Sequence, residues 1–589
     1  MPLPIEDYAA IGDGHTAALI GIDGSLDWLC LPQFDSPACF AGLLGDEDNG
    51  HWQLGPAGEH TARRRYIEDT AVLETTYRTD TGEVRVTDLM PTGERRADVV
   101  RRVEGVRGTV SFRHSWVVRF DYGRIRPWVH REQVGDHPAI IATAGPDKLI
   151  LTGPRLPRAV DGHHEETFDV QEGDRLDFTL TWVSSYRGIP DAIDIDERLA
   201  WTLEEQQSWA DSLHYDGPWR REVVRSLVTL RGLTHVDTGG IVAAPTTSLP
   251  EDFGGERNWD YRYCWLRDAA LTLESLLAAG LNDNARHWRN WLLRAIAGDP
   301  CDMQVMYTVE GGRHLPEIEL DHLAGYAGSR PVRIGNGAVK QRQSDVLGEV
   351  MCALSMARNR GVTETTDSWS LQRTLVNDLA DEWHRPDNGL WEIRGPMRHF
   401  THSRVMVWAA FDRGIEAIER HGLEGPLEEW RRIRAEVRAE IMERGFDEKR
   451  NTFTQHYDTD EVDASLLVLP LVRFIEGDDP RMVGTIAAVE QDLMRDGLLL
   501  RYRTKSGIDG LRGDEHPFLA CSFWLVAAYA LSGRRDDATA LMDRLVGLAN
   551  DVGLLSEEYD VAGDRMAGNF PQAFSHLALV TAAMKLRRA

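Results

Sequence analysis

The segment DNGLWEIRGPMRHFTHSR, residues 387–404, contains residue types that could act in acid catalysis. Trp391 and Glu392 lie between an Asn-Gly turn and a Gly-Pro break. Apolar surroundings disfavour an ionised carboxylate and raise its pKa, which suits a general acid. The competing interpretation is that Trp391 fills a local core and Glu392 is a solvated loop charge. For a single Trp-Glu pair, this structural interpretation is the stronger one.

A second acidic segment lies near the end of the chain, where Glu557 and Glu558 follow Leu554 and Leu555 and precede Tyr559. Adjacent carboxylates repel each other, so we expect one to face a pocket and the other to face solvent or a cation. A charged pair in a surface loop often has no function. Two such loops facing one pocket would be a stronger signal than either loop alone.

A third candidate is the Arg267–Asp268 pair at the start of a predicted helix. Arginine can fork two hydroxyl groups, and a carboxylate near a helix start accepts hydrogen bonds well. The aromatic residues around the pair suit a sugar, because hydroxyl groups need donors and acceptors together; they are Trp259, Tyr261, Tyr263 and Trp265. A helix cap paired with its neighbouring arginine explains Arg267 and Asp268 equally well.

Two further connections carry charged residues. Residues 325–337 hold four glycines with Arg330 and Arg333 as hydrogen-bond donors, but match neither GxGxxG nor GxxxxGK[ST], so a nucleotide site is disfavoured. Residues 496–517 hold Arg512, Asp514, Glu515 and His516 before an apolar helix.

Composition limits the choice of partners. The 589 residues exceed one ordinary core, so at least two domains are expected. A net charge of −28 disfavours nucleic acid and anionic membranes as partners. No signal peptide or bilayer-spanning run is evident, so a cytoplasmic location is predicted. The six cysteines are widely spaced and predict neither zinc nor a disulfide framework; they are Cys30, Cys39, Cys264, Cys301, Cys352 and Cys521.

Hydrophobic patterning divides the chain into three parts. Short alternating runs bounded by Gly, Asp and Pro predict an antiparallel β-sandwich over residues 1–190. Residues 191–217 change to a helical period and predict a linker. From residue 218 to 589 about twelve amphipathic helices are expected, beginning near Pro218, Trp265, Asp283, Ser344, Asp367, Thr401, Gly425, Glu461, Pro480, Pro517, Arg535 and Pro571.

The connections between these helices alternate in length. Short turns follow the even-numbered helices, and long loops rich in Gly, Trp, Arg and carboxylates precede them. Helix hairpins joined by long loops predict a closed (α/α)6 barrel, with all the long loops on one rim. Long loops in a compact domain are usually functional. An irregular helical bundle is the alternative, but it does not predict the alternation.

Several motifs in order along the chain resemble glycoside hydrolase family 15, the glucoamylase and trehalase family. They are GSLDWLCLPQFDSP, NWDYRYCWLRDAAL, GYAGSRPVRIGN, GLWEIRGPMRHFTHS and SEEYDVAGDRMAGNFPQAFSHLAL. The resemblance covers nearly the whole chain. It implies a β-sandwich followed by an (α/α)6 barrel, and hydrolysis of α-glucosides with inversion by two glutamates.

The resemblance also implies roles for individual residues. Glu392 is expected to be the general acid. Glu557, the first Glu of SEEYD, is expected to be the general base, although Glu558 replaces the family's Gln and leaves the choice between the two open. The expected substrate-binding residues are Arg267, Asp268, Tyr261, Trp265, Trp391 and Arg333. No metal or cofactor is expected. The turn-rich loop holding Trp28 and Asp35 is also predicted to reach the pocket.

The expected activity is release of β-D-glucose from the non-reducing end of an α-glucoside, with a slight preference for trehalose. Malto- and isomalto-oligosaccharides are the alternative substrates within this class. A phosphorylase would keep the acid and lose the base, so a carboxylate at Glu557 counts against it. A non-catalytic glucan-binding protein is disfavoured by the presence of both glutamates. The sequence leaves the oligomeric state open.

Overall fold

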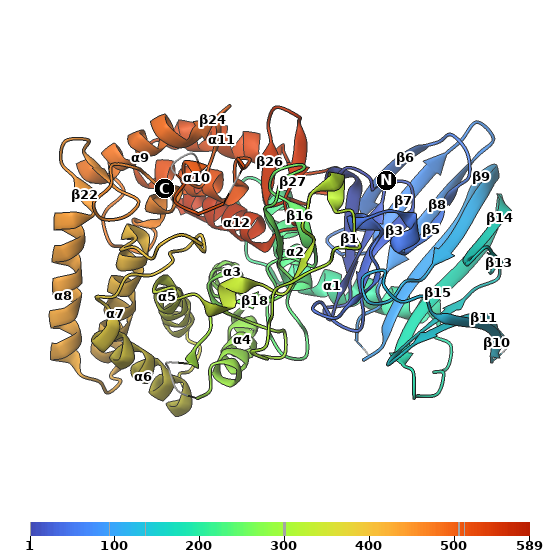
Figure 1. Ribbon diagram of the computed structural model, residues 1–589, viewed down its shortest axis with the longest axis horizontal. Coiled ribbons are helices and arrows are strands. Elements are labelled where there is room, and N and C mark those ends of the chain that lie inside the picture. The colour runs from blue at the N-terminus through green and yellow to red at the C-terminus, as the bar shows by residue number, and fades with distance from the viewer. Residues whose placement is uncertain are drawn as a thin grey trace.

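The computed structural model describes residues 2–93, 95–135, 137–298, 302–504, 507–511 and 513–588. Cys301 and Arg512, which the sequence analysis names, lie outside these ranges. Figure 1 shows two parts, a strand-rich part that begins the chain and a ring of helices that ends it. Among the described residues, no helix combines the length and apolar character that a bilayer crossing requires.

The strand-rich part is an antiparallel sandwich, as predicted. Its strands are β1 (Tyr8–Gly12), β2 (Ala17–Gly21), β3 (Ser25–Cys30), β4 (Ala38–Phe40), β5 (His51–Pro56), β6 (Thr61–Tyr66), β7 (Leu73–Arg78), β8 (Gly82–Leu89), β9 (Ala97–Val117), β10 (Trp128–Val134), β11 (His137–Ala144), β12 (Asp147–Thr152), β13 (Arg158–Val160), β14 (His163–Gln171) and β15 (Arg175–Ser184).

Strand β9 joins the two layers. Its first half pairs with β8 and β15, and its second half pairs with β5 and β14. It is one strand of 21 residues that runs through both layers. Gly108, at φ 65°, lies at the changeover between the two halves. Alternate side chains of β9 therefore contribute to a single core between the layers.

Helix α1 (Ile195–Asp211) connects the sandwich to the helical ring. The remaining helices are α2 (Arg220–Gly232), α3 (Leu266–Ala278), α4 (Asn282–Ala295), α5 (Asp345–Asn359), α6 (Thr366–Glu382), α7 (Thr401–His421), α8 (Leu427–Arg444), α9 (Pro480–Leu493), α10 (Leu519–Leu531), α11 (Arg535–Val546) and α12 (Ala573–Arg588). Helices α3, α5, α7, α10 and α12 form the inner layer, and α3 packs against both α12 and α5 to close the ring. Figure 1 shows α8 on its outer edge.

The predicted alternation is confirmed, with one difference. Each helix that follows a long loop belongs to the inner layer, except at the segment expected to begin near Glu461. That segment is the short 3-10 helix η7 (Ala464–Val468), which packs between α7 and α10. Pro470 lies two residues after the last residue of η7; it lacks a backbone N–H and its ring blocks a continuing helix. A short turn therefore takes the place of the sixth inner helix.

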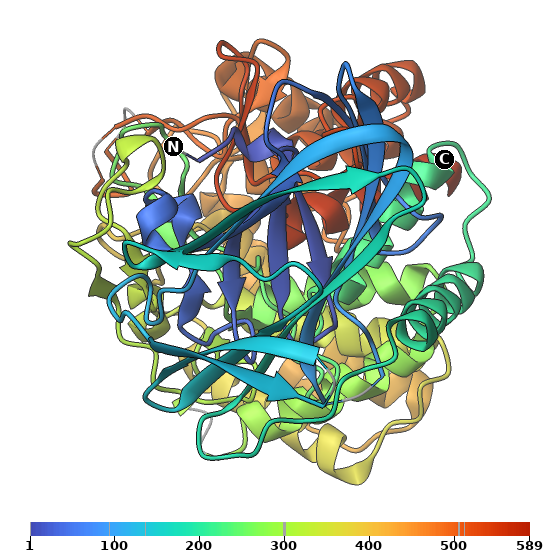
Figure 2. The same ribbon diagram turned by 90° about the vertical axis from the view of Figure 1, so that its right-hand side faces the viewer.

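The long loops contain small hairpins. These are β16–β17 (Thr247–Pro250, Asn258–Asp260), β18–β19 (Cys264–Trp265, Met306–Tyr307), β20–β21 (Ile318–Glu319, Arg333–Ile334), β22–β23 (Phe446–Asp447, Thr452–Phe453), β24–β25 (Met494–Arg495, Leu498–Leu499) and β26–β27 (Glu558–Asp560, Arg565–Ala567). Leu249, Leu323 and Phe570 from these loops are buried in the same core as the sandwich. Figure 2 shows the strands lying across this side of the ring.

A buried ion pair fixes this contact. Arg262 and Asp260 are both fully buried, and Arg262 Nη2 lies 2.6 Å from Asp260 Oδ2. Arg262 Nη1 also donates to the carbonyl of Ser36 in the sandwich, at 2.8 Å. Removing one partner of such a pair leaves an uncompensated buried charge, so the contact between sandwich and ring is specific.

We expect substitution Gly348→Ala to destabilise the protein. A Cβ at Gly348 would overlap the backbone carbonyl of Met406, where α5 packs against α7. The predicted loss in free energy of unfolding is about 1–3 kcal/mol, measurable by denaturant titration. Gly232→Ala is the matched control, because no atom lies within 4 Å of the added Cβ. An equal effect of the two substitutions would contradict this account of the inner ring.

Candidate active site

Glu392 lies in a closed loop before α7. Asp387 and Arg398 exchange two backbone hydrogen bonds of 2.9 Å, and Ile393 N donates to Asn388 O at 3.1 Å. Within this loop Glu392 has φ 58°, a left-handed conformation that non-glycine residues seldom adopt. Strained residues of this kind persist when the surrounding structure holds them, and they cluster at functional sites.

The Glu392 carboxyl group contacts Trp265 and Arg267. Trp265 Nε1 donates to Glu392 Oε1 at 2.6 Å, and Arg267 Nη2 lies 3.7 Å from the same oxygen. Burial raises the pKa of Glu392, while the charge of Arg267 opposes that rise. The side chain keeps 22% exposure, which leaves it reachable from the pocket. The sequence correctly predicts a carboxyl group beside an indole, but the indole belongs to Trp265.

The neighbouring Trp391 has a different partner. Its indole Nε1 donates to both carboxylate oxygens of Asp463, at 2.9 and 3.0 Å. Its ring packs near Phe518 and Trp524 and forms part of the pocket wall. Trp391 therefore fixes the loop and shapes the wall while the next residue presents its acid.

Arg267 and Asp268 begin helix α3 and line the same pocket. Arg267 Nη2 lies 3.0 Å from Asp268 Oδ2, and Arg267 Nη1 donates to the carbonyl of Leu390 at 2.7 Å. The guanidinium thus connects the α3 loop to the loop of Glu392. Asp268 is paired with its neighbour, but the N-cap of α3 is Trp265, so Asp268 does not cap the helix; both members of the pair line the pocket.

Glu557 is fully buried next to strand β26. Tyr261 Oη donates to Glu557 Oε1 at 2.7 Å, and the backbone N–H of Asn569 donates to Oε2 at 3.2 Å. Gly568 has φ 76°, and a Cβ there would lie 2.5 Å from the Cβ of Glu557, so only glycine fits. Burial, and next the charge of Glu251, raise the pKa of Glu557 to about 8.

Two aromatic side chains connect the two carboxyl groups. Tyr261 holds Glu557, Trp265 holds Glu392, and their rings meet edge to face with centroids 5.5 Å apart. Both rings line the pocket. Both carboxyl groups have raised pKa values, and the hydrogen bonds and the ring contact of Tyr261 and Trp265 connect them. Such an arrangement suits paired acid and base catalysis.

Glu558 is turned toward an arginine. Its Oε2 accepts a hydrogen bond from the backbone N–H of His516 at 3.0 Å, and its Oε1 lies 3.3 Å from Arg501 Nη2. Adjacent residues thus face different partners, as expected from repulsion between neighbouring carboxylates. Glu557 is held by the Tyr261 phenol, and Glu558 belongs to the ion network around Arg501.

That network is the one group of acids among the described residues with metal-ligand spacing. Carboxylate oxygens of Glu251, Glu515 and Glu558 lie within 4.8 Å of one another. Arg501 Nη2 contacts Glu251 at 2.7 Å and Glu515 at 2.6 Å as well as Glu558. The guanidinium therefore already supplies positive charge among the three carboxylates.

Glu557 is not itself part of the pocket wall and contacts it through Tyr261. Arg333, Trp28 and Asp35, which the sequence also named, lie away from the wall. Arg333 donates to the carbonyl of Glu256 at 2.8 Å and lies over the ring of Trp259 at 4.6 Å. Trp28 is fully buried and donates to the carbonyl of Pro245 at 2.8 Å. Asp35 accepts a hydrogen bond from Val309 N at 3.0 Å. Trp28 and Asp35 join the sandwich to the helical ring.

Sequence reasoning did not single out several pocket residues. Glu251 and Arg501 line the pocket and are buried, and Arg257 pairs there with Asp509 at 2.7 Å. Arg394 also lines it and lies over Trp259 at 4.2 Å. These residues lie in the long loops between helices, which the alternation of loop lengths predicts to be functional. Their partners, however, lie more than 100 positions away in the sequence. Only loop membership could have indicated them.

Comparisons with known proteins agree with this arrangement. Residues 217–584 match the family model of glycosyl hydrolases family 15, and residues 1–175 match that of a trehalase-like N-terminal region. A trehalase of Mycolicibacterium smegmatis is 39% identical, covering 100% of this chain and 92% of that protein. A trehalase of Thermoplasma acidophilum is 36% identical, covering 97% of this chain and 98% of that protein.

A solved bacterial glucoamylase complexed with acarbose has the same fold. It superposes with a TM-score of 0.74 at 12% identity, covering 99% of this chain and 94% of that one. This match extends over both the sandwich and the helical ring. At that level of identity the likeness concerns the fold alone.

We expect Glu557→Gln to raise stability at neutral pH. Unfolded glutamate ionises near its ordinary pKa of 4.5, whereas folded Glu557 keeps its proton up to about pH 8. Between these values the folded state binds more protons, so the stability of the unsubstituted protein falls as pH rises. The Tm of the variant should exceed that of the parent at pH 7, and the difference should shrink toward pH 4.

Glu319→Gln is the control, because Glu319 lies in an exposed loop strand. A Tm difference for Glu557→Gln that stays constant across this pH range would contradict the buried, protonated state of the group.

Proposed function

This chain belongs to glycosyl hydrolase family 15, and on that basis we propose that it is a trehalase that hydrolyses trehalose to glucose. The class of activity, a glycoside hydrolase, follows from membership of the family. The choice of trehalose rests on relatives named trehalase that match over nearly the whole chain at 34–39% identity. Malto- and isomalto-oligosaccharides remain the substrates against which this choice is tested.

The mechanism is supported by four connected side chains. Glu392 and Glu557 accept hydrogen bonds from Trp265 and Tyr261, and the rings of these two aromatic residues are in contact. Glu392 is the proposed general acid, because burial favours its protonated form and it reaches the pocket. It gives its proton to the glycosidic oxygen as the bond to C1 breaks. Glu557 is the proposed general base and takes a proton from the water that attacks C1 from the opposite face.

The hydrogen bond from Tyr261, which lines the pocket, supports Glu557 as the base over Glu558. Glu558 is held in an ion pair with Arg501 and by a backbone N–H, and both interactions reduce its availability as a proton acceptor. A raised pKa also makes Glu557 a stronger base once it is ionised. Attack by water from one face with departure from the other inverts the configuration at C1.

Five residues that line the pocket are proposed to bind the reacting glucose; they are Arg267, Asp268, Tyr261, Trp265 and Trp391. The Arg267–Asp268 pair offers donors and an acceptor for vicinal hydroxyl groups, and the aromatic rings supply apolar faces. Arg333 contributes indirectly, because its guanidinium packs on the ring of Trp259. Trp259 and Arg394 are proposed to contact the leaving glucose.

The domain limits that we propose are residues 1–190 for the sandwich, 191–217 for the linker and 218–589 for the catalytic barrel. A cytoplasmic location is also proposed. Its support is that the five described cysteines are free and buried, which suits a reducing compartment. The proposed chemistry uses carboxyl groups and water alone, with no metal or cofactor.

Glucose release from trehalose, maltose and isomaltose, measured side by side, tests the substrate. We expect trehalose to be hydrolysed with the highest kcat/KM. Inversion at one C1 predicts equal amounts of β- and α-glucose from trehalose, resolved by NMR before mutarotation. Glu392→Gln and Glu557→Gln should each lower kcat by about a hundredfold or more, and Glu319→Gln is the control.

Three results would overturn the proposal. They are absence of activity on trehalose, release of a single anomer, and phosphate-dependent formation of glucose 1-phosphate. The first concerns the substrate, the second the stereochemistry and the third the class of reaction.

We expect Tyr261→Phe to shift the acidic limb of the pH profile of kcat/KM to higher pH. Glu557 must be ionised to accept a proton, so activity rises with pH through its pKa. The hydrogen bond from Tyr261 lowers that pKa, and its loss therefore shifts the acidic limb to higher pH. Phenylalanine keeps the ring contact with Trp265. Tyr559→Phe is the matched control, because its hydroxyl donates to Asp564; an unmoved limb in Tyr261→Phe would exclude Glu557 as the group titrating there.

A further inference from the structure

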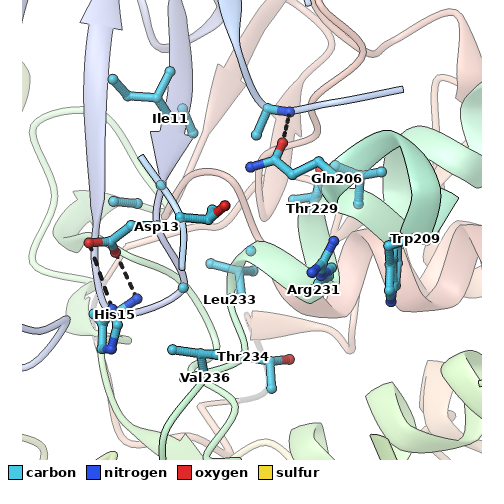
Figure 3. A pocket seen from close by; sticks show the side chains of 18 of the residues that line it. Ile11, Asp13, His15, Gln206, Trp209, Thr229, Arg231, Leu233, Thr234 and Val236 are labelled. Atoms are coloured by element: carbon cyan, nitrogen blue, oxygen red, sulfur yellow. Dashed lines mark hydrogen bonds and ion pairs between the residues drawn. The ribbon is translucent and has the colours of Figure 1, made fainter. Parts of the chain in front are cut away.

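A second cavity, of about 460 Å³, lies between the sandwich and the helical ring. Its walls come from the turn between β1 and β2, from helix α1, and from helix α2 with the turn that follows it (Figure 3). It shares no lining residue with the pocket of Glu392. Its volume is within the range of about 300–1,000 Å³ that is usual for small-molecule sites.

One buried amide in this cavity lacks a protein partner on one side. Gln206 on α1 is 8% exposed, and its Oε1 accepts a hydrogen bond from the backbone N–H of Ala71 at 2.7 Å. That bond fixes which end of the amide is oxygen. The Nε2 group then points away from Ala71 into the cavity (Figure 3), where no acceptor among the described residues bonds to it. This donor therefore faces the cavity without a protein partner and can donate to a molecule bound there.

The remaining polar groups resemble those of the catalytic pocket. Arg231 pairs with Glu205, and its guanidinium lies over the ring of Trp209 at 4.7 Å. Trp201 also lines the cavity and keeps 52% exposure. An arginine–carboxylate pair beside tryptophan is the same combination as Arg267–Asp268 beside Trp265. It presents donors, an acceptor and apolar faces to a single ligand.

Most charged groups of the cavity are paired within the protein. Burial lowers the pKa of His235 to about 4, so its ring is neutral. Arg225 donates to the carbonyl of Thr70 at 2.7 Å. The other charged groups form the pairs Arg231–Glu205, Arg95–Asp237, Arg220–Asp69 and His15–Asp13. Apart from Arg225, which bonds to backbone carbonyls and lies over the ring of Tyr66, these charged groups pair with one another, which favours a neutral ligand that carries hydroxyl groups.

We propose that this cavity is a second saccharide site, separate from the catalytic pocket, that binds a neutral mono- or disaccharide between the sandwich and the barrel. A sugar hydroxyl accepts the Gln206 amide proton, and others bond to the Arg231–Glu205 pair. Because the walls belong to both parts of the chain, a bound sugar strengthens the contact between them. The site goes beyond the proposed hydrolysis and takes no part in it.

The test is a calorimetric titration with D-glucose and with trehalose. The background variant is Glu392→Gln combined with Arg267→Ala, which prevents turnover and removes the main grip of the catalytic pocket. In this background we expect about one sugar to bind per chain, and the Tm to rise on binding. Gln206→Glu keeps an oxygen for Ala71 N and replaces only the amide nitrogen. It should weaken this binding about tenfold or more.

Gln207→Glu is the matched control. It makes the same chemical change at the next position of α1, where the side chain bonds to Asp211 and Asp69 N. It should leave sugar binding intact. The proposal is overturned if neither sugar binds the background variant at millimolar concentrations, or if Gln206→Glu and Gln207→Glu bind equally well. Because the titration requires no turnover, its outcome is independent of whether the unsubstituted protein hydrolyses trehalose.

Discussion

The structure depends most on the burial of ionisable carboxyl groups beside one another. Glu557 and Glu558 are adjacent and both fully buried, and each carries a raised pKa. Two such groups are tolerated only when each has its own partner, because unpaired buried charge is costly. Tyr261 satisfies the first and Arg501 the second. The long loops of the ring bring these partners together from distant parts of the sequence.

The ring of helices explains why those loops can be so polar. The helices and the apolar residues of the loops share one core, which leaves the polar residues of the loops free to line the pocket. The sandwich packs against several of these loops, and the Arg262–Asp260 pair binds across the contact to Ser36. Charged groups near the pocket are thereby withdrawn from water, which strengthens their mutual electrostatic interactions.

This arrangement carries a cost in stability at the site itself. Glu392 occupies a left-handed backbone conformation, and Glu557 holds a proton that it would lose in the unfolded chain at neutral pH. Each feature favours the unfolded state. Both are supported by the surrounding hydrogen bonds, Asp387–Arg398 around one loop and Tyr261 with Asn569 around the other. The features of Glu392 and Glu557 that suit proton transfer therefore lower the stability of the folded state.

The amino-acid sequence by itself determined the two-part architecture and the inner and outer order of the helices, because local periodicity and loop length are properties of neighbouring residues. It also marked the loops of Glu392, Glu557 and Arg267. The tertiary structure alone decided which indole holds Glu392, that Arg333 lies behind Trp259, and that Arg501 joins Glu251 to Glu558. It also decided that η7, cut short before Pro470, completes the ring. These outcomes depend on contacts between segments far apart in the chain, which patterning along one segment does not encode.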